Sequence, residues 1–409
     1  MSNVVVIGGG PAGVLAACVA SKNGHDVTLI ERNTRIGRKL MITGKGRCNV
    51  TNAVTDPKEV IDQVPVNGRF LFSALSQFMT YDTMDLFEGL GVPLKVERGN
   101  RVFPVSDKSV DIVDALAKYL KQCHVKQVCA RVSSINTDND SVTSVTTDDG
   151  REFKCDRVIL ATGGMSYTAT GSTGDGYNIA RDLGHTIVDL NPSLVPIESS
   201  DPCCKAMQGL SLKNVEIKVA ETKTGKVIYK DFGEMLFTHF GVSGPIVLSA
   251  SSHMRRLIDG QYNLIIDLKP ALSEEQLDFR VQRDFLEQQN KDFQNSLGGL
   301  LPSKMIPVVV EKCGVDPQKK VNQLTKQERH ALVYTLKNFE VPLSKFRPIN
   351  EAIITSGGVD TREINPKTME SKLVNGLFFA GEIIDVDAYT GGFNLQIAFS
   401  TGYLAGQSV

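Results

Sequence analysis

Apolar residues occur in short, nearly continuous runs, several of which lead into glycine, and such runs predict buried β-strands. The run at residues 4–7 leads into a glycine cluster and a stretch of small residues, and the run at 27–30 ends on Glu31. Two later runs, at 157–161 and 377–380, also lead into glycine. The order of strand, glycine turn, small-residue helix and strand at the start of the chain is typical of a dinucleotide-binding fold.

The first glycine turn fits the spacing G-x-G-x-x-G, with Gly8, Gly10 and Gly13. The first glycine permits the tight turn, the second lets the backbone approach a pyrophosphate, and the third lets the helix pack closely on the strand. Glu31 follows Gly13 by 18 residues, where a carboxylate can accept both ribose hydroxyls and would repel a 2′-phosphate. A glycine-rich turn without a ligand leaves Glu31 unexplained. Because FAD and NAD enzymes share the motif, it does not decide the nucleotide.

The remaining pattern predicts further elements and two domains. A helix is expected at residues 69–90, and β-rich runs at 125–128, 131–137, 141–147 and 152–153 predict a small antiparallel meander. Runs at 215–219, 227–229 and 262–268 indicate a second sheet or barrel, which charged, helical sequence follows at 273–339. Strand-and-glycine sequence returns at 353–358. We therefore expect a discontinuous nucleotide-binding domain at 1–190 and 346–409, and an inserted domain at 191–345.

Composition narrows the class of protein. At 409 residues the chain exceeds the usual size of a single core, and its net charge of −1 gives no global basic field for nucleic acid or an anionic membrane. No apolar run reaches the roughly 18 residues of a membrane span, so we expect a cytoplasmic protein without a membrane partner. The eight cysteines lack C-x-x-C and zinc-ligand spacing, so we predict reduced thiols and no metal. Cys203 and Cys204 are interpreted as ordinary loop or surface thiols.

Four motifs carry a resemblance to a known family. They are the run from Thr43 to Asn52, Ala161-Thr162-Gly163-Gly164, and the runs at 237–245 and 379–396. With these motifs the chain resembles the BaiN/RdsA family of NAD(P)/FAD-dependent oxidoreductases, flavoproteins with two dinucleotide-binding domains. A further run at 170–180 resembles a segment of fumarate reductase flavoproteins and ketosteroid dehydrogenases, and we expect its Asp175 to cap the following helix.

The resemblance implies an α/β fold: a Rossmann-like FAD-binding domain of the glutathione-reductase type with an inserted β-barrel-like plus helical domain. It implies FAD, with the helix after Gly392 aimed at the flavin pyrimidine and the segment from Gly44 to Asn49 around the isoalloxazine. Lys45 or Arg47 would supply a cation there, and a solvated loop is the alternative. The residues expected to bind FAD are Gly8, Gly10, Pro11, Ala12, Gly13, Glu31, Arg32, Arg38, Lys39, Thr43, Gly44, Gly46, Arg47, Cys48, Asn49, Val128, Ala161, Thr162, Gly163, Gly381, Glu382, Gly391, Gly392, Asn394 and Leu395.

The catalytic candidates are Cys48, Arg47, His239 and Tyr389. Cys48 has no partner cysteine in its motif, so dithiol exchange is not expected; the thiol is interpreted as a packing residue, a proton donor or a sulfenate former. Histidine suits acid/base work near neutral pH, and the alternative for His239 is a turn histidine bonded to backbone. Tyr389 either donates a hydrogen bond to a substrate carbonyl or packs at the helix entrance.

The resemblance implies reduction of a C=C bond conjugated to a carbonyl, as in an unsaturated 3-oxo bile acid or a uracil ring of ribosomal RNA. It also implies NAD(P)H as a transient donor, although no second G-x-G-x-x-G follows a strand. An RNA substrate needs a cationic surface, for which Arg35, Arg38, Lys39, Lys45 and Arg47 are candidates, whereas a steroid needs an apolar cavity. A flavin-dependent oxidase of small amines or ketoamines and a non-enzymatic flavin redox sensor remain alternatives.

Overall fold

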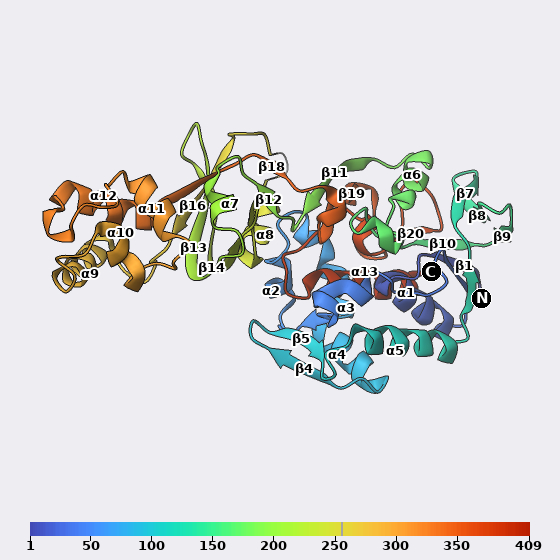
Figure 1. Cartoon of the computed structure of the whole chain (residues 1–409). Helices are drawn as coiled ribbons and strands as arrows, with labels where there is room; N and C mark the ends of the chain where they lie inside the picture. Colours follow the sequence, from blue (N-terminus) through green and yellow to red (C-terminus); the bar gives the residue numbers. More distant parts are fainter. Residues whose placement is uncertain (255–256) are drawn as a thin grey trace. The chain divides into compact units, whose positions relative to one another are not determined.

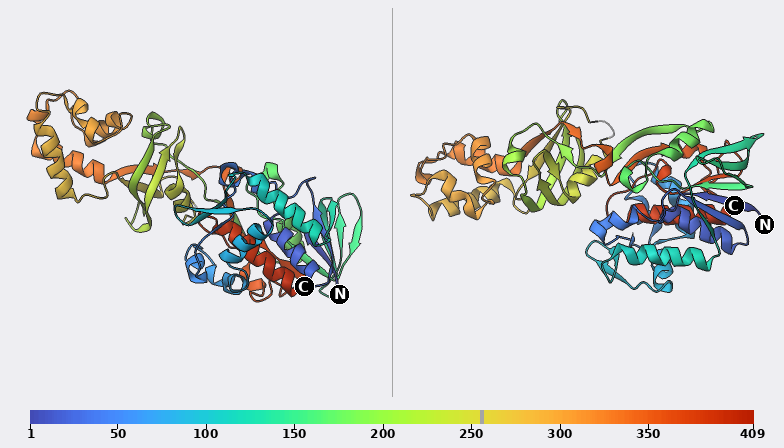
Figure 2. Two further views of the ribbon diagram at one scale, coloured as in Figure 1. Left: turned by 90° about the horizontal axis from the view of Figure 1, so that it is seen from below. Right: turned by 45° about the vertical axis from the view of Figure 1, so that its right-hand side comes forward.

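The computed structural model describes residues 1–254 and 257–409 (Figures 1 and 2). Its internal contacts divide the chain into two units: unit 1 comprises Met1–Ser193 and Pro348–Val409, and unit 2 comprises Leu194–Arg347. Each unit has a hydrophobic core of its own. Unit 2 is therefore an uninterrupted segment that is inserted into the sequence of unit 1.

The centre of unit 1 is a five-stranded sheet in which every pairing is parallel. Its strands, in spatial order, are β20 (Leu377–Phe379), β10 (Arg157–Leu160), β1 (Asn3–Ile7), β2 (Asp26–Glu31) and β6 (Lys126–Cys129). The prediction that residues 125–128 belong to an antiparallel meander is wrong. Helix α5 (Ser109–Gln122) precedes β6 and supplies the crossover that a parallel strand requires.

The last helix of the chain packs directly on the first. Helix α13 (Phe393–Ser408) lies against α1 (Pro11–Lys22), as both views show (Figures 1 and 2). A Cβ atom on Gly402 would lie 2.3 Å from the carbonyl oxygen of Ala12, and one on Gly406 would lie 2.5 Å from that of Ala16. Only glycine permits this close approach. The contact holds the end of the chain against α1, the helix that begins at the first glycine turn.

Three small sheets and short helices complete unit 1. The predicted helix at 69–90 is divided into η2 (Gly68–Leu71), α3 (Phe72–Gln77) and α4 (Thr80–Gly89). It is interrupted at Phe78, whose carbonyl accepts hydrogen bonds from Gln396 Nε2 and Ser400 Oγ on α13. The other elements are η1 (Leu40–Gly46), β3 (Thr51–Asn52), α2 (Pro57–Ile61), β4 (Leu94–Glu97), β5 (Arg101–Pro104), the meander β7 (Val132–Asp138), β8 (Ser141–Thr147) and β9 (Glu152–Lys154), then η3 (Thr168–Thr170), α6 (Asp175–Asp182), β11 (Ile187–Ser193), η6 (Ile349–Glu351), β19 (Ile354–Val359), η7 (Thr361–Glu363) and η8 (Gly381–Ile383).

Unit 2 contains a seven-stranded antiparallel sheet. Its spatial order is β17 (Phe339–Leu343), β16 (Tyr262–Asp267), β13 (Ser211–Glu221), β14 (Val227–Phe237), β15 (Gly241–Ser243), β12 (Ile197–Glu198) and β18 (Lys345–Phe346). The two border strands, β17 and β18, are consecutive in the chain and are separated only by Ser344. One continuous segment therefore borders both ends of the sheet, which gives it the expected barrel-like form.

Helices occupy the remainder of unit 2. The helical prediction for 273–339 is confirmed by α9 (Glu274–Leu286), α10 (Phe293–Ser296), η4 (Leu297–Gly299), α11 (Ile306–Cys313), η5 (Val321–Gln323) and α12 (Lys326–Lys337). Capping boxes at Ser273 and Thr325 fix the starts of α9 and α12. The remaining helices are α7 (Cys203–Ala206) and α8 (Pro245–Ser251). Cys203 and Cys204 are buried within α7, so their interpretation as loop or surface thiols is wrong.

None of the helices in the described ranges has the length and hydrophobicity needed to cross a bilayer. Within the same ranges, no cluster of three or more His, Cys, Asp or Glu side chains is arranged to hold a metal ion.

Candidate cofactor and active site

The first glycine turn connects β1 to α1 at the carboxyl end of the central sheet. Gly8 has a φ of +109°, and a Cβ atom there would lie 2.4 Å from the carbonyl oxygen of Ala161. A Cβ on Gly13 would lie 2.0 Å from the carbonyl oxygen of Gly8, whereas a Cβ on Gly10 would meet no atom within 4 Å. Gly8 and Gly13 are thus needed for packing. Gly10, directly before Pro11 and Ala12 at the start of α1, leaves open space in front of the helix N-terminus, where an anion is stabilised.

Glu31 ends β2 and faces this turn. Its Oε2 atom accepts a 2.7 Å hydrogen bond from the backbone N–H of Gly9, and its Oε1 atom accepts hydrogen bonds from the backbone and side chain of Asn33. The carboxylate is held in one orientation, and Oε2, which accepts only one of these hydrogen bonds, keeps a lone pair for a hydroxyl group. Val128 lies on the neighbouring strand β6, where it is paired with Ile30 and half-buried.

The segment from Thr43 to Asn49 forms a tight, irregular loop. Gly44, Lys45, Gly46 and Cys48 all have φ values between +56° and +84°, which a regular helix does not allow. The Cys48 side chain is completely buried, and this burial raises the pKa of its thiol to about 12, although a hydrogen bond with Thr43 opposes the shift. The thiol therefore stays protonated at neutral pH.

Two buried oxygen atoms in the predicted cofactor segments have no hydrogen-bond partner within the described residues. They are Asn49 Oδ1 in this loop and Thr162 Oγ1, which follows β10 and precedes Gly163. Buried polar atoms are normally hydrogen-bonded, so each of these oxygens calls for a partner from outside the chain. Together with the open space beside Gly10, they fit a bound dinucleotide that carries hydroxyl, amide and phosphate groups.

The C-terminal segment contributes the other side of the site. Gly381, with a φ of +78°, lies so close to α1 that a Cβ there would be 2.9 Å from the Cβ of Ala12. Gly392 has a φ of +98°, and a Cβ there would be 2.2 Å from the carbonyl oxygen of Thr51. Gly391 accepts a 3.0 Å hydrogen bond from Asn52 Nδ2. These contacts fix the N-terminus of α13 beside the segment that follows the Thr43–Asn49 loop.

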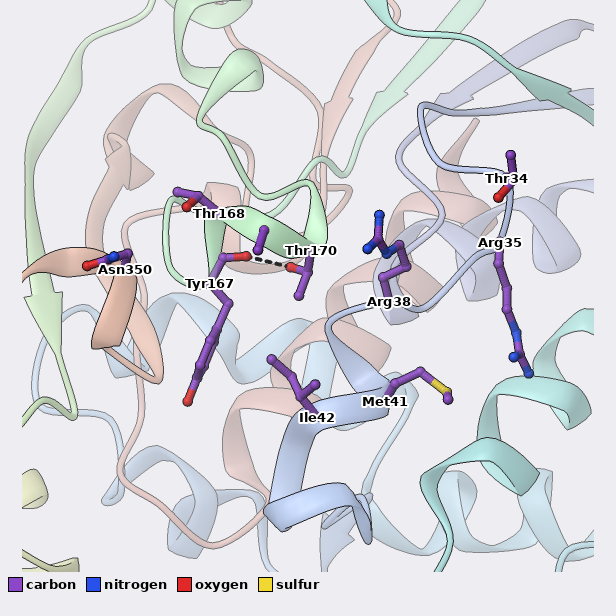
Figure 3. Close-up of a pocket in the computed structure, with 10 residues that line it drawn as sticks. Thr34, Arg35, Arg38, Met41, Ile42, Tyr167, Thr168, Thr170 and Asn350 are labelled. Atoms are coloured by element: carbon purple, nitrogen blue, oxygen red, sulfur yellow. Dashed lines mark hydrogen bonds between the residues drawn. The ribbon is translucent and has the colours of Figure 1, made fainter.

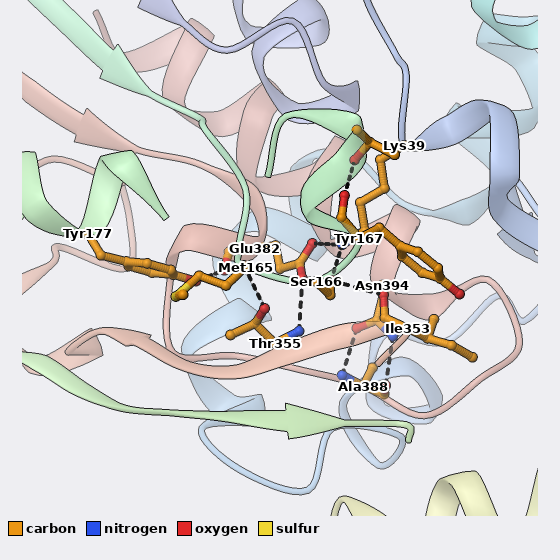
Figure 4. A network of polar contacts seen from close by, with 11 residues as sticks. Lys39, Met165, Ser166, Tyr167, Tyr177, Ile353, Thr355, Glu382, Ala388 and Asn394 are labelled. Atoms are coloured by element: carbon orange, nitrogen blue, oxygen red, sulfur yellow. Dashed lines mark hydrogen bonds and ion pairs between the residues drawn. The ribbon is translucent and has the colours of Figure 1, made fainter. Parts of the chain in front are cut away.

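The side chain of Asn394, in the first turn of α13, is hydrogen-bonded to the loop that precedes this helix. Its Oδ1 atom accepts a hydrogen bond from the backbone N–H of Ala388, and its Nδ2 group donates to the carbonyl of the same residue (Figure 4). Leu395 is half-buried beside it. Tyr389 lies within this loop, where its backbone N–H donates to the carbonyl of Gln63.

A polar network joins four distant segments of unit 1 (Figure 4). Lys39 Nζ donates 2.6 Å hydrogen bonds to Ser166 Oγ and to Glu382 Oε2. The other oxygen of Glu382 accepts hydrogen bonds from Ser166 Oγ and from the backbone N–H of Thr355. The charge of Lys39 is thus neutralised by Glu382, and the ion pair ties the loop after β2 to η8.

The other predicted cations are mostly paired with carboxylates. Arg47 forms ion pairs with Glu97 and Asp107, and its guanidinium lies 4.1 Å from the centre of the Phe103 ring. Arg32 forms an ion pair with Asp175. The expectation that Asp175 caps α6 is wrong, because Gly174 is the N-cap residue and makes no side-chain hydrogen bond. The Asp175 carboxylate instead pairs with Arg32 and Arg131, and the hydrogen bond from Arg131 lowers its pKa.

His239 belongs to unit 2, in the exposed turn between β14 and β15, where its ring lies 5.0 Å from the ring of Phe240.

Within unit 1, the contacts described above bring together the glycine turn, Glu31, the Thr43–Asn49 loop and the Gly381–Gly392 segment. Ser166, Thr355 and Gln396 were missed by the sequence analysis, although Ser166 directly follows the Ala161–Gly164 motif and Met165. Gln396 is fully buried, and its side-chain oxygen accepts hydrogen bonds from Thr51 and Thr83.

Comparisons with known proteins agree with this arrangement. The family model of the HI0933-like protein Rossmann domain matches residues 2–408. The 3-dehydro-bile acid delta(4,6)-reductase of Clostridium scindens is 32% identical, and the alignment covers 100% of this chain and 99% of that protein. The ribosomal RNA dihydrouridine synthase of Escherichia coli is 31% identical over 100% of this chain and 98% of its own length.

Among solved structures, the 3-ketosteroid-delta4-(5alpha)-dehydrogenase of Rhodococcus jostii matches with a TM-score of 0.50 and 16% identity, covering 100% of this chain and 95% of that one. This likeness shows the shared fold. The chain belongs to the HI0933-like family of flavoprotein oxidoreductases, with a Rossmann-type FAD-binding domain.

Proposed function

We propose that this chain uses FAD to saturate a C=C bond that is conjugated to a carbonyl group in a small molecule, with NAD(P)H as the transient electron donor. The full-length likeness to two kinds of enzyme carries the proposal. A 3-dehydro-bile acid delta(4,6)-reductase and a dihydrouridine synthase act on unlike substrates. Both reactions, however, add two hydrogens across a C=C bond conjugated to a carbonyl. We infer that this chemistry is what the present chain shares with them.

The fit of unit 1 to FAD supports the proposal. Gly10 and the start of α1 would meet the pyrophosphate, and Glu31 the adenosine ribose. The unpartnered oxygens of Asn49 and Thr162 would bond to the cofactor, and the N-terminus of α13 would stabilise negative charge on it. Bound FAD supplies hydride transfer, which no side chain provides.

The electron balance of the reaction defines what the substrate must receive. Saturating one C=C bond needs a hydride equivalent at one carbon and a proton at its neighbour. NAD(P)H provides the hydride equivalent and leaves as NAD(P)+, and the proton comes from solvent or from a side chain. Polarisation of the carbonyl makes the β-carbon electrophilic, so a hydrogen-bond donor at the carbonyl oxygen assists the reaction.

The charges of unit 1 favour a small substrate over RNA. Of the five cations in the predicted basic cluster, Arg35 pairs with Asp114, Lys39 with Glu382, and Arg47 with Glu97 and Asp107. Paired cations attract phosphate weakly, because the neighbouring carboxylate cancels much of the field. Reduction of a uracil ring in ribosomal RNA is the second candidate, and the dihydrouridine synthases of Escherichia coli and Haemophilus influenzae, 31% and 30% identical over the full chain, favour it.

The remaining alternatives receive less support from the geometry. A redox sensor that reacts through Cys48 needs an accessible thiolate, whereas the Cys48 thiol is buried and burial raises its pKa to about 12. An amine or ketoamine oxidase needs the same cofactor, so the cofactor site does not distinguish it from a C=C reductase. The two reaction classes differ in their substrates and in the use of oxygen as the oxidant.

Anaerobic half-reactions test the proposal. The purified protein would be reduced with NADH or NADPH and then mixed with a 3-oxo-Δ4,6 bile acid, with ribosomal RNA from a deletion strain, or with oxygen. We expect reduction by at least one nucleotide and fast reoxidation by the bile acid, with a saturated product identified by mass spectrometry. Turnover of amines with oxygen, without reoxidation by either unsaturated compound, would contradict the proposal. Reoxidation by RNA alone would favour the second candidate.

A further inference from the structure

A cavity of about 590 Å³ lies in unit 1 between the loop after β2 and the segment after β10 (Figure 3). Met41 and Ile42 form an apolar part of its wall, and Tyr167 comes from the opposite segment. Met41 and Ile42 directly precede the Thr43–Asn49 loop. The cavity therefore borders the segment that we propose holds the flavin, which is where a substrate has to be placed.

Three polar side chains of this cavity are already engaged. Arg35 pairs with Asp114, Arg38 donates a hydrogen bond to Asn33, and Thr170 Oγ1 donates to the carbonyl of Tyr167. No residue in the described ranges is hydrogen-bonded to the Tyr167 hydroxyl. In Figure 3 the Tyr167 side chain extends out of its loop with the hydroxyl at the far end, away from Thr170. Tyr167 thus offers the cavity an unengaged donor on a rigid ring.

The backbone of Tyr167 is held in an unfavourable conformation. Its φ and ψ are both 53°, in the left-handed region that bulky residues rarely adopt. The segment is fixed on both sides: the backbone N–H of Met165 donates to Thr355 Oγ1, Ser166 bonds to Lys39 and Glu382, and the carbonyl of Tyr167 accepts from Thr170. Such strain persists where surrounding contacts impose it, commonly at functional sites.

We propose that this cavity admits a flat, unsaturated ring and that the Tyr167 hydroxyl donates a hydrogen bond to the carbonyl oxygen conjugated with its C=C bond. The inference rests on the proposed function. Hydride addition to the β-carbon moves negative charge onto this oxygen, so the hydrogen bond strengthens in the transition state. Partial burial raises the pKa of Tyr167, which keeps the phenol protonated and able to donate.

The Tyr167→Phe variant removes the hydroxyl and keeps the ring. We expect the rate constant for reoxidation of the reduced enzyme, at subsaturating 3-oxo-Δ4,6 bile acid, to fall roughly 10- to 100-fold, the usual effect of losing a hydrogen bond to developing charge. FAD content and the rate of reduction by NAD(P)H should not change. By calorimetry, the saturated 3-oxo bile acid should bind roughly 5- to 10-fold more weakly, because a neutral hydrogen bond is lost.

Two further variants complete the test. Tyr81→Phe changes a tyrosine that is 50% exposed on α4 and should leave every parameter at the wild-type value. Ile42→Trp fills the cavity from its apolar wall and should raise KM at least about tenfold without slowing reduction by NAD(P)H. If ribosomal RNA proves to be the oxidant, the same variants are measured with RNA.

The outcomes separate the two proposals. Wild-type protein that neither the bile acid nor RNA reoxidises would overturn the proposed function, and the role of Tyr167 with it. Wild-type protein that is reoxidised, together with a Tyr167→Phe variant of equal rate and equal affinity, would overturn only the role of Tyr167.

Discussion

Gly10 is a glycine that the fold itself does not require. Its φ is −79°, which alanine adopts freely, and a Cβ there meets no protein atom within 4 Å. We therefore expect Gly10→Ala to leave the free energy of unfolding of the cofactor-free protein unchanged within about 0.5 kcal/mol. The methyl group would occupy the space that we assign to the pyrophosphate, so FAD content after purification should fall at least about tenfold.

The matched control is Gly298→Ala, because Gly298 in unit 2 also has open space around its Cβ position. It should retain full FAD content, measured by absorbance after denaturation. Equal FAD content in both variants would contradict the assignment of the pyrophosphate to the glycine turn.

His185 gives unit 1 a predictable response to acid. The side chain is 3% exposed, its Nε2 lies 2.7 Å from Ser371 Oγ, and its ring packs against Phe379. Burial lowers its pKa below the ordinary value of 6.5. The unfolded chain therefore binds a proton more readily than the folded chain, and stability is lost as pH falls from 6.5 through the lowered folded-state pKa.

Urea unfolding at pH 7.5 and 5.5, followed by circular dichroism, measures this loss. The His185→Gln variant should lose less stability than the wild type over the same interval. The remaining dependence includes His253, whose pKa burial also lowers. Equal losses in both proteins would show that His185 does not titrate in this window.

Residues that act through local backbone geometry could be predicted from the sequence, and those that act through distant partners could not. The spacing of Gly8, Gly10 and Gly13 defines the turn directly. In contrast, the partner of Lys39 is Glu382, which is 343 residues away, so no local pattern connects them. Arg47 was predicted as a cation for the flavin or substrate without knowledge of Glu97 and Asp107.

At the level of elements, the contact between α1 and α13 decides whether the two ends of the chain share one site. Gly402 has no space for a side chain, because a Cβ would lie 2.3 Å from the backbone oxygen of Ala12. We expect Gly402→Ala to push the helices apart and lower the free energy of unfolding by about 1–3 kcal/mol, as overpacking does. FAD content should fall as well, since α13 starts at Gly392.

Gly89→Ala is the matched control. Gly89 ends helix α4, and a Cβ there would meet nothing within 4 Å. Alanine should stabilise the protein by about 0.5–1 kcal/mol, because glycine costs more backbone entropy on folding. The two glycine-to-alanine changes thus have opposite expected signs in thermal or urea unfolding. A stabilised Gly402→Ala variant would contradict the close packing of α1 and α13.

The errors in predicting elements share one physical cause. The segment 125–128 resembles its antiparallel neighbours in composition, but α5 in front of it makes it a parallel crossover strand beside β2. The predicted helix at 69–90 is broken where the carbonyl of Phe78 turns to Gln396 and Ser400 on α13. Both outcomes depend on tertiary contacts, which override local preference.

For the whole molecule, the distribution of charge determines whether RNA can be a substrate. The net charge is −1, and in the predicted basic cluster only Arg38 and Lys45 lack a carboxylate partner among the described residues. With about two cations available, the logarithm of the RNA-binding constant should fall with the logarithm of salt concentration with a slope of roughly −1.4. Fluorescence anisotropy of a labelled ribosomal RNA fragment between 50 and 200 mM KCl, concentrations at which such slopes are resolved, measures this slope.

A matched pair of variants identifies where RNA contacts the protein, if it does. Lys45→Gln should make the slope smaller by about 0.7, the contribution of one phosphate contact on a single strand. Lys118→Gln changes an exposed lysine on α5 outside the cluster and should leave the slope unchanged. A wild-type slope steeper than about −5 with nanomolar affinity would require many more phosphate contacts than this cluster offers. The RNA would then have to bind elsewhere on the chain, and the uracil reaction would become the better-supported function.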